Sequence, residues 1–374
     1  MKIVIIGPAP PPNGGISIHI KRIMHGLKTR GMDYTLYNES PTSIQDKHIV
    51  SLKSYKKFFL KFSFIRGDVF HFHSINKHLR MLLGVYALLG KKIILTVHGE
   101  SLIQQLQSAG PWTRFLLIQS LRRIDGIICV NAAHTNELVK WGFHEEKIQT
   151  IPSYLEPVES PEDAARIPEY VYQWMESAPF LISANGSVRL LDGKDLYGID
   201  QLIELMRRLK DSGFDACLLF TVLGASALNE GERRYYNELK QKIVRNGLES
   251  RFWFYEAEDT EFYPILQKSK LFIRPTLQDG YGVSIAEALH YGVPSIASDV
   301  CVRPEGTLGY RAGDVSDLLD KVKEIVQNYD QVKQRIQRSR PTGYFDELLA
   351  AYERISGSRT FVGKGKVISD EYYK

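Results

Sequence analysis

The sequence predicts an α/β protein with two doubly wound parallel sheets, one after the other along the chain. Its 374 residues, 44% of them hydrophobic and 24% charged, suffice for two or three domains with full-sized cores. Short apolar runs alternate with longer helical stretches, first in one half of the chain and again in the other. Strands separated by helices require right-handed crossover connections, and such connections make a sheet parallel.

The first alternation gives an N-terminal doubly wound domain over residues 1–155. Its opening run, from Lys2 to Ile6, is apolar after one lysine and ends at Gly7-Pro8, as a buried strand before a loop does. We expect strands at residues 2–6, 34–37, 69–71, 92–97, 126–130 and 148–151. Helices are expected between them, near residues 16–30, 51–65, 76–89, 112–123 and 132–141.

A segment rich in proline and acids, residues 156–179, is expected to link two domains. The second domain, residues 180–340, has expected strands at 180–184, 216–222, 252–255, 271–273 and 295–297, with helices near 199–211, 231–246, 260–268, 283–291 and 314–328. A C-terminal helix and tail are expected over residues 341–374. Two such domains direct the C-terminal ends of their strands toward a shared cleft, where ligands of open α/β sheets bind.

Charge is unevenly divided along the chain. Residues 1–150 contain 20 Lys and Arg against 9 Asp and Glu, whereas residues 151–374 contain 28 against 34. The most basic stretch, residues 53–66, has five cations, five aromatic rings and no acid. On a helix it would present rings beside cations, which suits an anionic membrane surface. The alternative is a solvated helix whose lysine stems cover part of the core.

Other features of the sequence indicate an intracellular protein. The longest apolar run, residues 81–89, has about half the length that a membrane span requires. Cys129, Cys217 and Cys301 lie far apart, and such a sparse, odd set is typical of a reducing compartment. The sequence has no helix-turn-helix, zinc-finger or ribonucleoprotein signature, so nucleic acid is not an expected partner. We expect a cytoplasmic protein, peripheral at the inner face of the cell membrane.

The most informative motif lies between residues 274 and 294. It reads Arg274-Pro-Thr-Leu-Gln-Asp279-Gly-Tyr-Gly282-Val-Ser-Ile-Ala-Glu287, followed by Ala-Leu-His-Tyr-Gly-Val-Pro294. Its glycines let backbone N–H groups approach a ligand, and the helix that follows presents about half a positive charge at its N-terminus. Asp279 and Glu287 can then hold opposite ends of a nucleotide sugar. The alternative is a strand, turn and helix in which Asp279 only caps the helix.

This motif resembles the donor-site signature of retaining GT-B glycosyltransferases of family 4. That signature has two carboxylates separated by seven residues, a Gly-aromatic-Gly turn and a Gly-x-Pro entry to the next strand. Here the first carboxylate is Asp279, where the family usually has Glu. The resemblance implies the GT-B fold, in which two Rossmann-like domains face a central cleft. It also implies a donor site formed by Arg274, Gly280, Tyr281, Gly282, Val283, Ser284 and Glu287.

Other segments support the same resemblance, which extends from residue 1 to about residue 330. Gly14 and Gly15 resemble the glycine loop of the family's N-terminal domain and would approach the sugar diphosphate. His98, which ends an expected strand, would lie beside the transferred sugar and contact it without acting as a nucleophile. Of His71 and His73, we expect only His73 to face the cleft.

The expected chemistry relies on cations in place of a metal ion. Metal-dependent sugar transferases use an Asp-x-Asp motif, and neither that motif nor a His/Cys cluster with ligand spacing occurs in the sequence. We therefore expect no metal and no cofactor, the nucleotide sugar being a co-substrate. Arg274 is one candidate contact of the diphosphate, and Tyr197 stands where the family often has a lysine. The expected catalytic residues are Asp279, His98, Arg189 and Lys194.

The resemblance implies a retaining glycosyltransferase. It would move a sugar from a UDP- or GDP-sugar to a glycan or lipid-linked acceptor, as in capsule or exopolysaccharide assembly. Two alternatives stay open: a non-catalytic GT-B subunit that binds the nucleotide sugar, and a sugar-nucleotide epimerase. A nicotinamide oxidoreductase is disfavoured, because neither glycine loop has the G-x-G-x-x-G spacing of a dinucleotide site.

Overall fold

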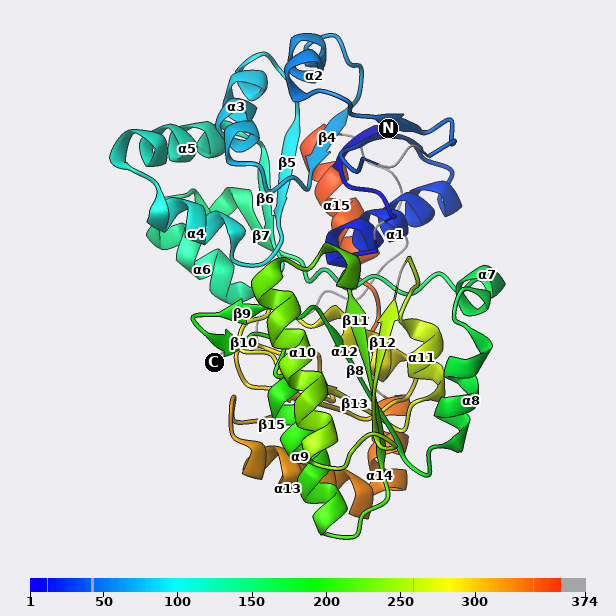
Figure 1. The fold of residues 1–374 in the computed structure, drawn as a ribbon. Coiled ribbons are helices and arrows are strands. Elements are labelled where there is room, and N and C mark those ends of the chain that lie inside the picture. Colours follow the sequence, from blue (N-terminus) through cyan, green and yellow to red (C-terminus); the bar gives the residue numbers. More distant parts are fainter. Residues whose placement is uncertain (12, 42–43, 258, 339, 358–374) are drawn as a thin grey trace.

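The computed structural model describes residues 1–11, 13–41, 44–257, 259–338 and 340–357. It shows two α/β domains, one above the other in Figure 1, each built around a parallel sheet. None of the helices in these ranges is both long and apolar enough to cross a membrane. The tail that the sequence predicts beyond residue 357 lies outside the described residues.

The N-terminal sheet is parallel throughout. Its strands are β1 (Lys2–Gly7), β2 (Asp33–Asn38), β3 (Ile49–Ser51), β4 (Val69–Phe72), β5 (Ile93–Val97), β6 (Gly126–Cys129) and β7 (Ile148–Thr150). They lie in the order β3-β2-β1-β4-β5-β6-β7. Ile5 of β1 pairs with Leu36 on one side and with His71 on the other. Strands are added in one direction from β1 to β3 and in the other direction from β4 to β7. The topological switch point therefore lies between β1 and β4, where ligands of such sheets bind.

Helices cover both faces of this sheet. One face carries α2 (Tyr55–Phe62), α3 (Lys77–Leu88), α4 (Ser101–Ser108), α5 (Pro111–Arg123) and α6 (Ala132–Lys140), which pack against Val4 and Ile6 of β1. The other face carries α1 (Gly15–Thr29) and α15 (Phe345–Ser356), which pack against Ile3 and Ile5. Successive residues of β1 contribute to different cores because strand side chains alternate between faces.

The segment between the domains contains regular structure that the sequence does not predict. Residues 156–179 include α7 (Pro161–Ala165) and α8 (Glu169–Ser177), and α8 contributes Val171 and Met175 to the core of the second domain. Pro161 stands in the first turn of α7, where its missing N–H removes no helical hydrogen bond. The prolines of this segment therefore mark a helix start as well as a connection.

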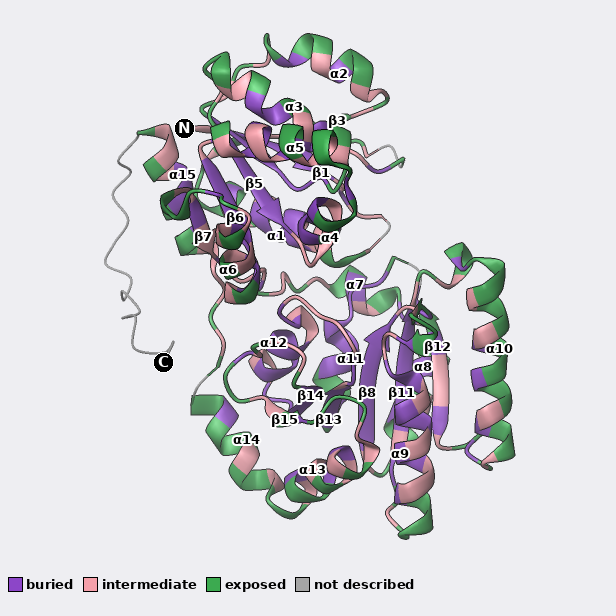
Figure 2. Cartoon of the chain, turned by 90° about the vertical axis from the view of Figure 1, so that its left-hand side faces the viewer, coloured by how far each residue is buried: buried purple, intermediate pink, exposed green. Residues whose placement is uncertain are grey.

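The second sheet is also parallel, with strand order β12-β11-β8-β13-β14-β15. Its strands are β8 (Leu181–Gly186), β11 (Cys217–Leu223), β12 (Phe252–Ala257), β13 (Leu271–Arg274), β14 (Ser295–Ser298) and β15 (Leu308–Tyr310). Figure 2 shows its central strands buried between helices. A separate antiparallel pair, β9 (Leu190–Leu191) and β10 (Lys194–Asp195), follows β8.

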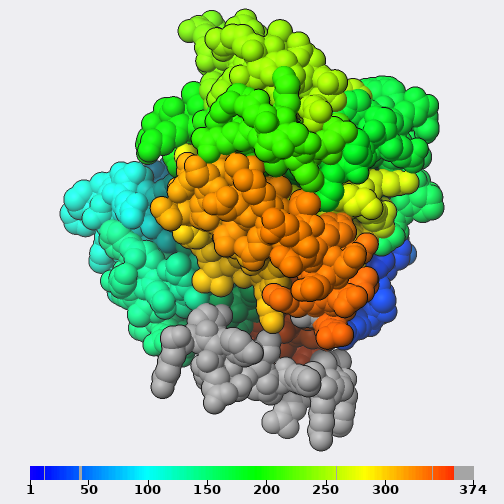
Figure 3. Space-filling model, turned by 90° about the horizontal axis from the view of Figure 1, so that it is seen from below, coloured from blue at the N-terminus to red at the C-terminus, as the bar shows by residue number. Residues whose placement is uncertain are grey.

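Helices again cover both faces of the second sheet. One core includes α9 (Ile199–Asp211), α10 (Glu230–Arg245) and α13 (Val315–Gln327), and the other includes α8, α11 (Tyr263–Lys268), α12 (Val283–His290) and α14 (Tyr329–Arg338). From below, the orange segment that contains α13 and α14 lies across the middle of the surface in Figure 3, and the N-terminal domain shows only at the edges. After α14 the chain crosses back, so that α15 completes the N-terminal core.

Candidate functional site

A cavity lies between the two domains. The first turns of α1 and α12 both border it. Each helix N-terminus carries about half a positive charge and unpaired N–H groups, so the cavity is suited to an anionic group such as a diphosphate. The N-terminal domain lines it with Gly14, Gly15, Ile18, His19 and Arg22, and the second domain lines it with Asn185, Glu261, Val283, Ser284 and Glu287.

Gly282 lets α12 begin at the edge of this cavity. Its φ of +86° lies in the left-handed region that favours glycine. A Cβ here would lie 2.6 Å from Cδ1 of Ile285 and 3.1 Å from Nη1 of Arg303. Glycine therefore allows the chain to turn from β13 into α12 and leaves Val283 and Ser284 beside the cavity.

A row of hydrogen bonds leads from the cavity to Asp279. Ser284 Oγ accepts from Asn185 Nδ2 at 3.1 Å, and Asn185 Oδ1 accepts from Arg274 Nη1 at 3.4 Å. Arg274 Nε in turn donates to Asp279 Oδ2 at 2.6 Å. Asn185, which was not predicted from the sequence, stands near the C-terminal end of β8, where ligands of such sheets bind.

Two arginines hold the carboxylate of Asp279. Besides Arg274, Arg303 donates from Nη1 to Asp279 Oδ2 at 2.8 Å. Burial disfavours the charged carboxylate, but attraction to Arg274 and Arg303 outweighs burial and lowers the pKa of Asp279. The carboxylate that the sequence analysis assigns to the sugar thus contacts guanidinium groups, one of which the sequence analysis missed.

Glu287 meets a cation from the other domain. Arg22 of α1 lies with Nη1 2.7 Å from Glu287 Oε1 and donates from Nη2 to Glu261 Oε2 at 3.0 Å, and all three side chains are buried. Burial opposes the charged guanidinium, yet the two carboxylates raise the pKa of Arg22. Burial also raises the pKa of Glu287, against the attraction of Arg22. Glu287 therefore joins the two domains as well as lining the cavity.

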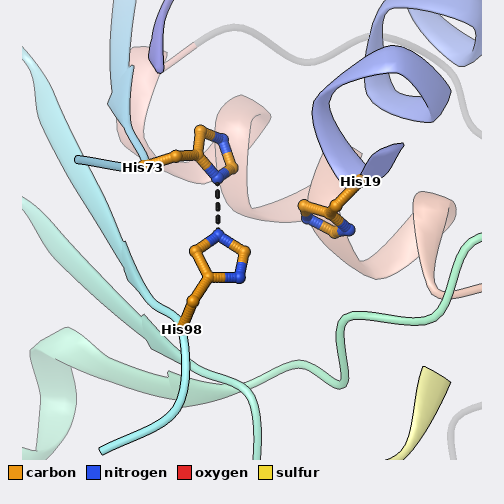
Figure 4. A group of neighbouring side chains, drawn as sticks. All are labelled: His19, His73 and His98. Carbon is orange, nitrogen blue, oxygen red and sulfur yellow. Dashed lines mark hydrogen bonds between the residues drawn. The ribbon is translucent and has the colours of Figure 1, made fainter. Parts of the chain in front are cut away.

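Three histidines gather on the N-terminal side of the cleft (Figure 4). His73 Nδ1 and His98 Nε2 are 2.9 Å apart, and His19 Nδ1 is 2.8 Å from the carbonyl oxygen of Ser153. Burial lowers the pKa of His19 to about 4 and the pKa values of His73 and His98 well below their ordinary value. At neutral pH the cluster is uncharged. Within the described part of the chain, these are the three side chains that could together hold a metal ion, with ligand atoms within 4.8 Å of one another.

His71 lies directly beside this cluster. Its ring centroid is 4.0 Å from that of His73, and its nitrogens lie 2.7 Å from Tyr352 Oη and 2.6 Å from Thr96 Oγ1. Residues two apart on a strand point the same way, so His71 lies on the same side of the sheet as His73, but His73 is the one that belongs to the group of three. His71 packs behind the cluster and connects it to α15.

Arg189 and Lys194 lie away from the cavity. The Arg189 side chain is 62% exposed, 3.7 Å from Glu232, and Lys194 is an exposed residue of β10. Next to it, Asp195 accepts hydrogen bonds from the backbone N–H groups of residues 197–200 and anchors the start of α9. The loop is therefore shaped around Asp195, and the structure does not bring either predicted cation to Ser284.

The loop before α12 contacts the N-terminal domain. Asn131 Nδ2 donates to the carbonyl oxygen of Gly280 at 2.6 Å, and a Cβ on Gly280 would lie 3.2 Å from Cγ2 of Val130. Tyr281 is buried, with its ring 6.3 Å from that of Tyr344. Gly280 and Tyr281 thus fix the loop between the domains, whereas Val283 and Ser284 face the cavity.

A carboxylate that the sequence analysis missed follows β2. Burial raises the pKa of the Glu39 carboxyl group, against the opposite influence of Ser74 and Tyr55. Its Oε1 atom is buried without a partner among the described residues. Because β2 and β4 are separated in the sheet only by β1, Glu39 is on the same edge of the sheet as His73.

Two sequence families match the chain. The model of Glycosyltransferase Family 4 matches residues 13–156, and the model of Glycosyl transferases group 1 matches residues 189–328. The chain belongs to the GT-B glycosyltransferases of family 4. The two matched segments contain both sides of the cavity, Gly14 to Arg22 in the first and Ser284 to Glu287 in the second.

Solved structures share the fold of this family 4 glycosyltransferase. A glycosyltransferase from Rickettsia africae superposes with a TM-score of 0.70 at 14% identity, over 95% of this chain and 98% of that one. Anabaena HepE, solved in complex with UDP, superposes with a TM-score of 0.64 at 15% identity, over 96% and 99%. At these identities the likeness shows the fold alone.

A curated relative of this glycosyltransferase is the lipopolysaccharide core biosynthesis mannosyltransferase LpsB of Rhizobium meliloti (strain 1021). The two are 25% identical over 195 residues, which are 50% of this chain and 48% of LpsB. The alignment thus spans about half the length of the relative.

Proposed function

We propose that this family 4 glycosyltransferase is a retaining enzyme of cell-surface polysaccharide synthesis, of the capsule or exopolysaccharide type. It takes a sugar from a UDP- or GDP-sugar to a glycan or lipid-linked acceptor, without a metal ion. The observation that carries the proposal is the convergence of two helix N-termini and Glu287 on one cavity. LpsB, by its name, acts in lipopolysaccharide core synthesis, and HepE has been solved with UDP.

In the proposed complex the donor spans the cavity. Its diphosphate contacts the backbone at Gly14 and Gly15 and the first turn of α12 at Ser284, which is an arrangement that favours anions. The ribose hydroxyls lie at Glu287, whose carboxylate accepts hydrogen bonds. The transferred sugar extends toward His98, which is neutral and offers a hydrogen bond without a competing charge.

The proposed reaction exchanges one bond at the anomeric carbon for another on the same face. The acceptor hydroxyl oxygen bonds to C1 of the sugar while the bond from C1 to the diphosphate oxygen breaks. The electron pair leaves with the nucleoside diphosphate, and one of its phosphate oxygens takes the proton of the acceptor hydroxyl. Helix N-termini stabilise the charge that develops on the leaving group, because they are already oriented toward it.

Metal independence is part of this proposal. Arg22, Asn185 and the two helix N-termini surround the cavity, whereas its carboxylates Glu261 and Glu287 are already paired with Arg22. If a metal ion did act, the cluster of His19, His73 and His98 would be the place to expect it. A chelator should leave donor turnover unchanged, and restoration of activity by added zinc after chelation would contradict the proposal.

A non-catalytic GT-B subunit is the second candidate. Two observations favour it: Arg189 and Lys194 lie outside the cavity, and the Asp279 carboxylate is already paired with Arg274 and Arg303. Such a subunit would bind a nucleoside diphosphate but would not turn over the donor. The epimerase alternative has no support from the matched families.

Release of UDP or GDP from activated sugars separates these candidates. The purified chain should release a nucleoside diphosphate from one donor class, slowly with water and faster with a lipid-linked acceptor, and the product should keep the anomeric configuration of the donor. Glu287→Ala is the control with a damaged donor site. Ligand binding stabilises the folded state by mass action. Thermal stabilisation by UDP or GDP, with no release of UDP or GDP from any activated sugar, would therefore establish that the chain is a non-catalytic subunit.

We further propose a cytoplasmic location and contact with the inner face of the membrane through residues 53–66. Lys53, Lys56, Lys57 and Lys61 are all exposed, so their charges are available to anionic lipid. Replacing these four lysines by glutamine should weaken binding to anionic vesicles, most of all at low salt. Binding that ignores the four charges would contradict this contact.

A further inference from the structure

Exposed apolar side chains are concentrated on three helices of the N-terminal domain. Trp112, Leu60 and Phe64 are 81%, 79% and 84% exposed. At such exposure a large apolar side chain buries little area and contributes little to folding stability. Surfaces that face only water seldom carry such a group of neighbours. We call the following residues the apolar face: Leu60 and Phe64 of α2 and its C-terminal end, Leu82, Val85, Leu88 and Leu89 of α3 and its C-terminal end, and Trp112, Phe115 and Leu116 of α5.

α3 is a neighbour of both α5 and α2. Gly84 of α3 donates its N–H to Ser120 Oγ of α5 at 2.8 Å, and a Cβ on Gly84 would lie 2.6 Å from the Ser120 backbone. Phe59 of α2 stacks on Tyr86 of α3, with ring centroids 5.8 Å apart. Figure 2 shows α2, α3 and α5 together at the end of the N-terminal domain that lies away from the second domain.

The helices expose their apolar groups on the side away from the core. In α5 the core side holds Leu117 and Leu121, whereas Trp112, Phe115 and Leu116 are exposed. In α2 the rings of Phe58 and Phe62 are buried, so the aromatic stripe expected from the sequence packs inward. The outward apolar side chains therefore contribute little to the hydrophobic core of this domain.

The chain segment that carries the apolar face is rich in cations. Residues 53–123 contain 12 Lys and Arg against two acids, Asp68 and Glu100. Arg80 is buried and Lys92 pairs with Asp125, but lysines 53, 56, 57 and 61 are exposed, as are Arg66 and Arg123. A partner protein of ordinary composition carries both signs of charge, so it would be matched by a surface with acids as well as cations. An anionic bilayer offers phosphate groups to the cations and hydrocarbon to the apolar side chains.

We propose that the apolar face inserts into an anionic membrane. This inference deepens the membrane contact proposed above: lysines attract the protein to the surface, and the apolar side chains of three helices then enter the acyl boundary. If the apolar side chains insert, part of the protein should stay bound to the membrane at high salt. Electrostatic attraction by residues 53–66 alone would be screened at high salt and would not hold the protein there. Arg80 ties α3 to the neighbouring α4, because it donates to Ser101 Oγ and Gln105 Oε1.

The test is vesicle sedimentation of the full chain at low and at high salt. Vesicles of phosphatidylcholine with phosphatidylglycerol should bind the wild type at low salt and retain a substantial part at high salt. The variant Leu88→Ser/Leu89→Ser/Trp112→Ser should lose the retained part, with partitioning weakened about tenfold or more. Tyr170→Ser/Val244→Ser, exposed apolar positions of α8 and α10, is the matched control and should bind as the wild type.

Trp112 fluorescence gives a second readout of the same event. Its emission should shift to shorter wavelength with vesicles and should be quenched by brominated acyl chains, and the shift should vanish in Trp112→Phe. Complete release at high salt, or unchanged binding of the triple variant, would overturn insertion and leave only electrostatic contact. A wild-type dimer that the triple variant converts to a monomer would assign the face to a second copy and overturn insertion as well.

Donor turnover separates a failure of this inference from a failure of the proposed function. The triple variant alters only exposed positions far from the cavity, so its release of UDP or GDP in solution should match the wild type. A chain that inserts but never releases a nucleoside diphosphate would refute the proposed function and leave insertion standing.

Discussion

The two domains share one architecture but treat charge at the cleft in different ways. The strand ends of the N-terminal domain carry uncharged histidines, among them His73 and His98, whose burial lowers their pKa values. The corresponding loops of the second domain carry ion pairs, such as Asp279 with Arg274 and Arg303. Arg22 is an exception, a buried N-terminal cation that pairs with Glu261 and Glu287 across the cleft.

The difference teaches how burial selects polar groups at the ends of parallel strands. A buried histidine can shed its charge and keep its hydrogen bonds, whereas a buried carboxylate that stays charged requires a cation. The N-terminal side thus offers neutral hydrogen-bonding groups, which suit sugar hydroxyls. The second side offers fixed charge and helix N-termini, which suit a diphosphate. Four variants or conditions probe this contrast.

Arg22→Met should have the largest effect. It leaves Glu261 and Glu287 buried beside each other without their shared cation, so we expect a loss of about 3–5 kcal/mol of folding free energy. Urea unfolding measures this loss. Lys21→Met is the matched control, because Lys21 also pairs with Glu261 but is 33% exposed, and it should cost about 1 kcal/mol or less. Equal stability of the two variants would show that the interdomain pair contributes little.

The contrast also explains which parts could be predicted from the sequence. The central strands, such as β1 and β5, are buried on both faces and therefore appear as unbroken apolar runs, which are easy to recognise. β3 has three residues, two of them exposed, so it carries no such run. Short helices such as α7 likewise lack an apolar period.

Within the site, local motifs could be predicted and long-range partners could not. The glycines at residues 280 and 282 carry a signal in the sequence because their backbone requirements are local. Arg22, Arg303 and Asn185 have roles only through partners that the fold brings from distant segments. Arg189 and Lys194 illustrate the converse, since family position suggested a contact that the loop around Asp195 does not make.

Glu287→Ala should have the next largest effect, on donor binding. Loss of a charged partner for the ribose hydroxyls should weaken binding by about 1.5–3 kcal/mol, as measured by titration calorimetry with UDP and GDP. Glu287→Gln keeps the shape and should fall between Ala and wild type. An affinity unchanged in both variants would remove Glu287 from the donor site and restrict it to the domain contact.

Acid pH should distinguish the two domains through their titrating groups. The folded-state pKa of His71 is about 3, below the ordinary value near 6.5, so between these pH values the unfolded chain holds a proton that the folded chain lacks. Stability therefore falls as pH is lowered through this window, by about 1.4 kcal/mol per pH unit for each such histidine. Asp195 acts in the opposite direction, because burial raises its folded-state pKa to about 6.

Unfolding free energies between pH 7 and pH 4 check this prediction. His71→Gln should reduce the slope by about one proton, and Asp195→Asn should make it steeper below pH 6. A slope that does not change in His71→Gln would mean that His71 is protonated in the folded protein.

Arg189→Ala should have the smallest effect. Its exposed pair with Glu232, at 3.7 Å, should contribute at most about 0.5 kcal/mol to stability. If Arg189 stays at the surface during the reaction, donor release should also remain within about twofold of the wild type. A large fall in turnover at unchanged donor affinity would instead show that the loop swings Arg189 to the diphosphate when the donor is bound, as the family resemblance implies.

The most direct test is the structure of this chain crystallised with UDP- or GDP-sugar. We expect the diphosphate between the first turns of α1 and α12, in contact with Gly14, Gly15 and Ser284, with the ribose at Glu287. A nucleotide bound elsewhere, or a cavity that stays empty at saturating donor concentration, would contradict it.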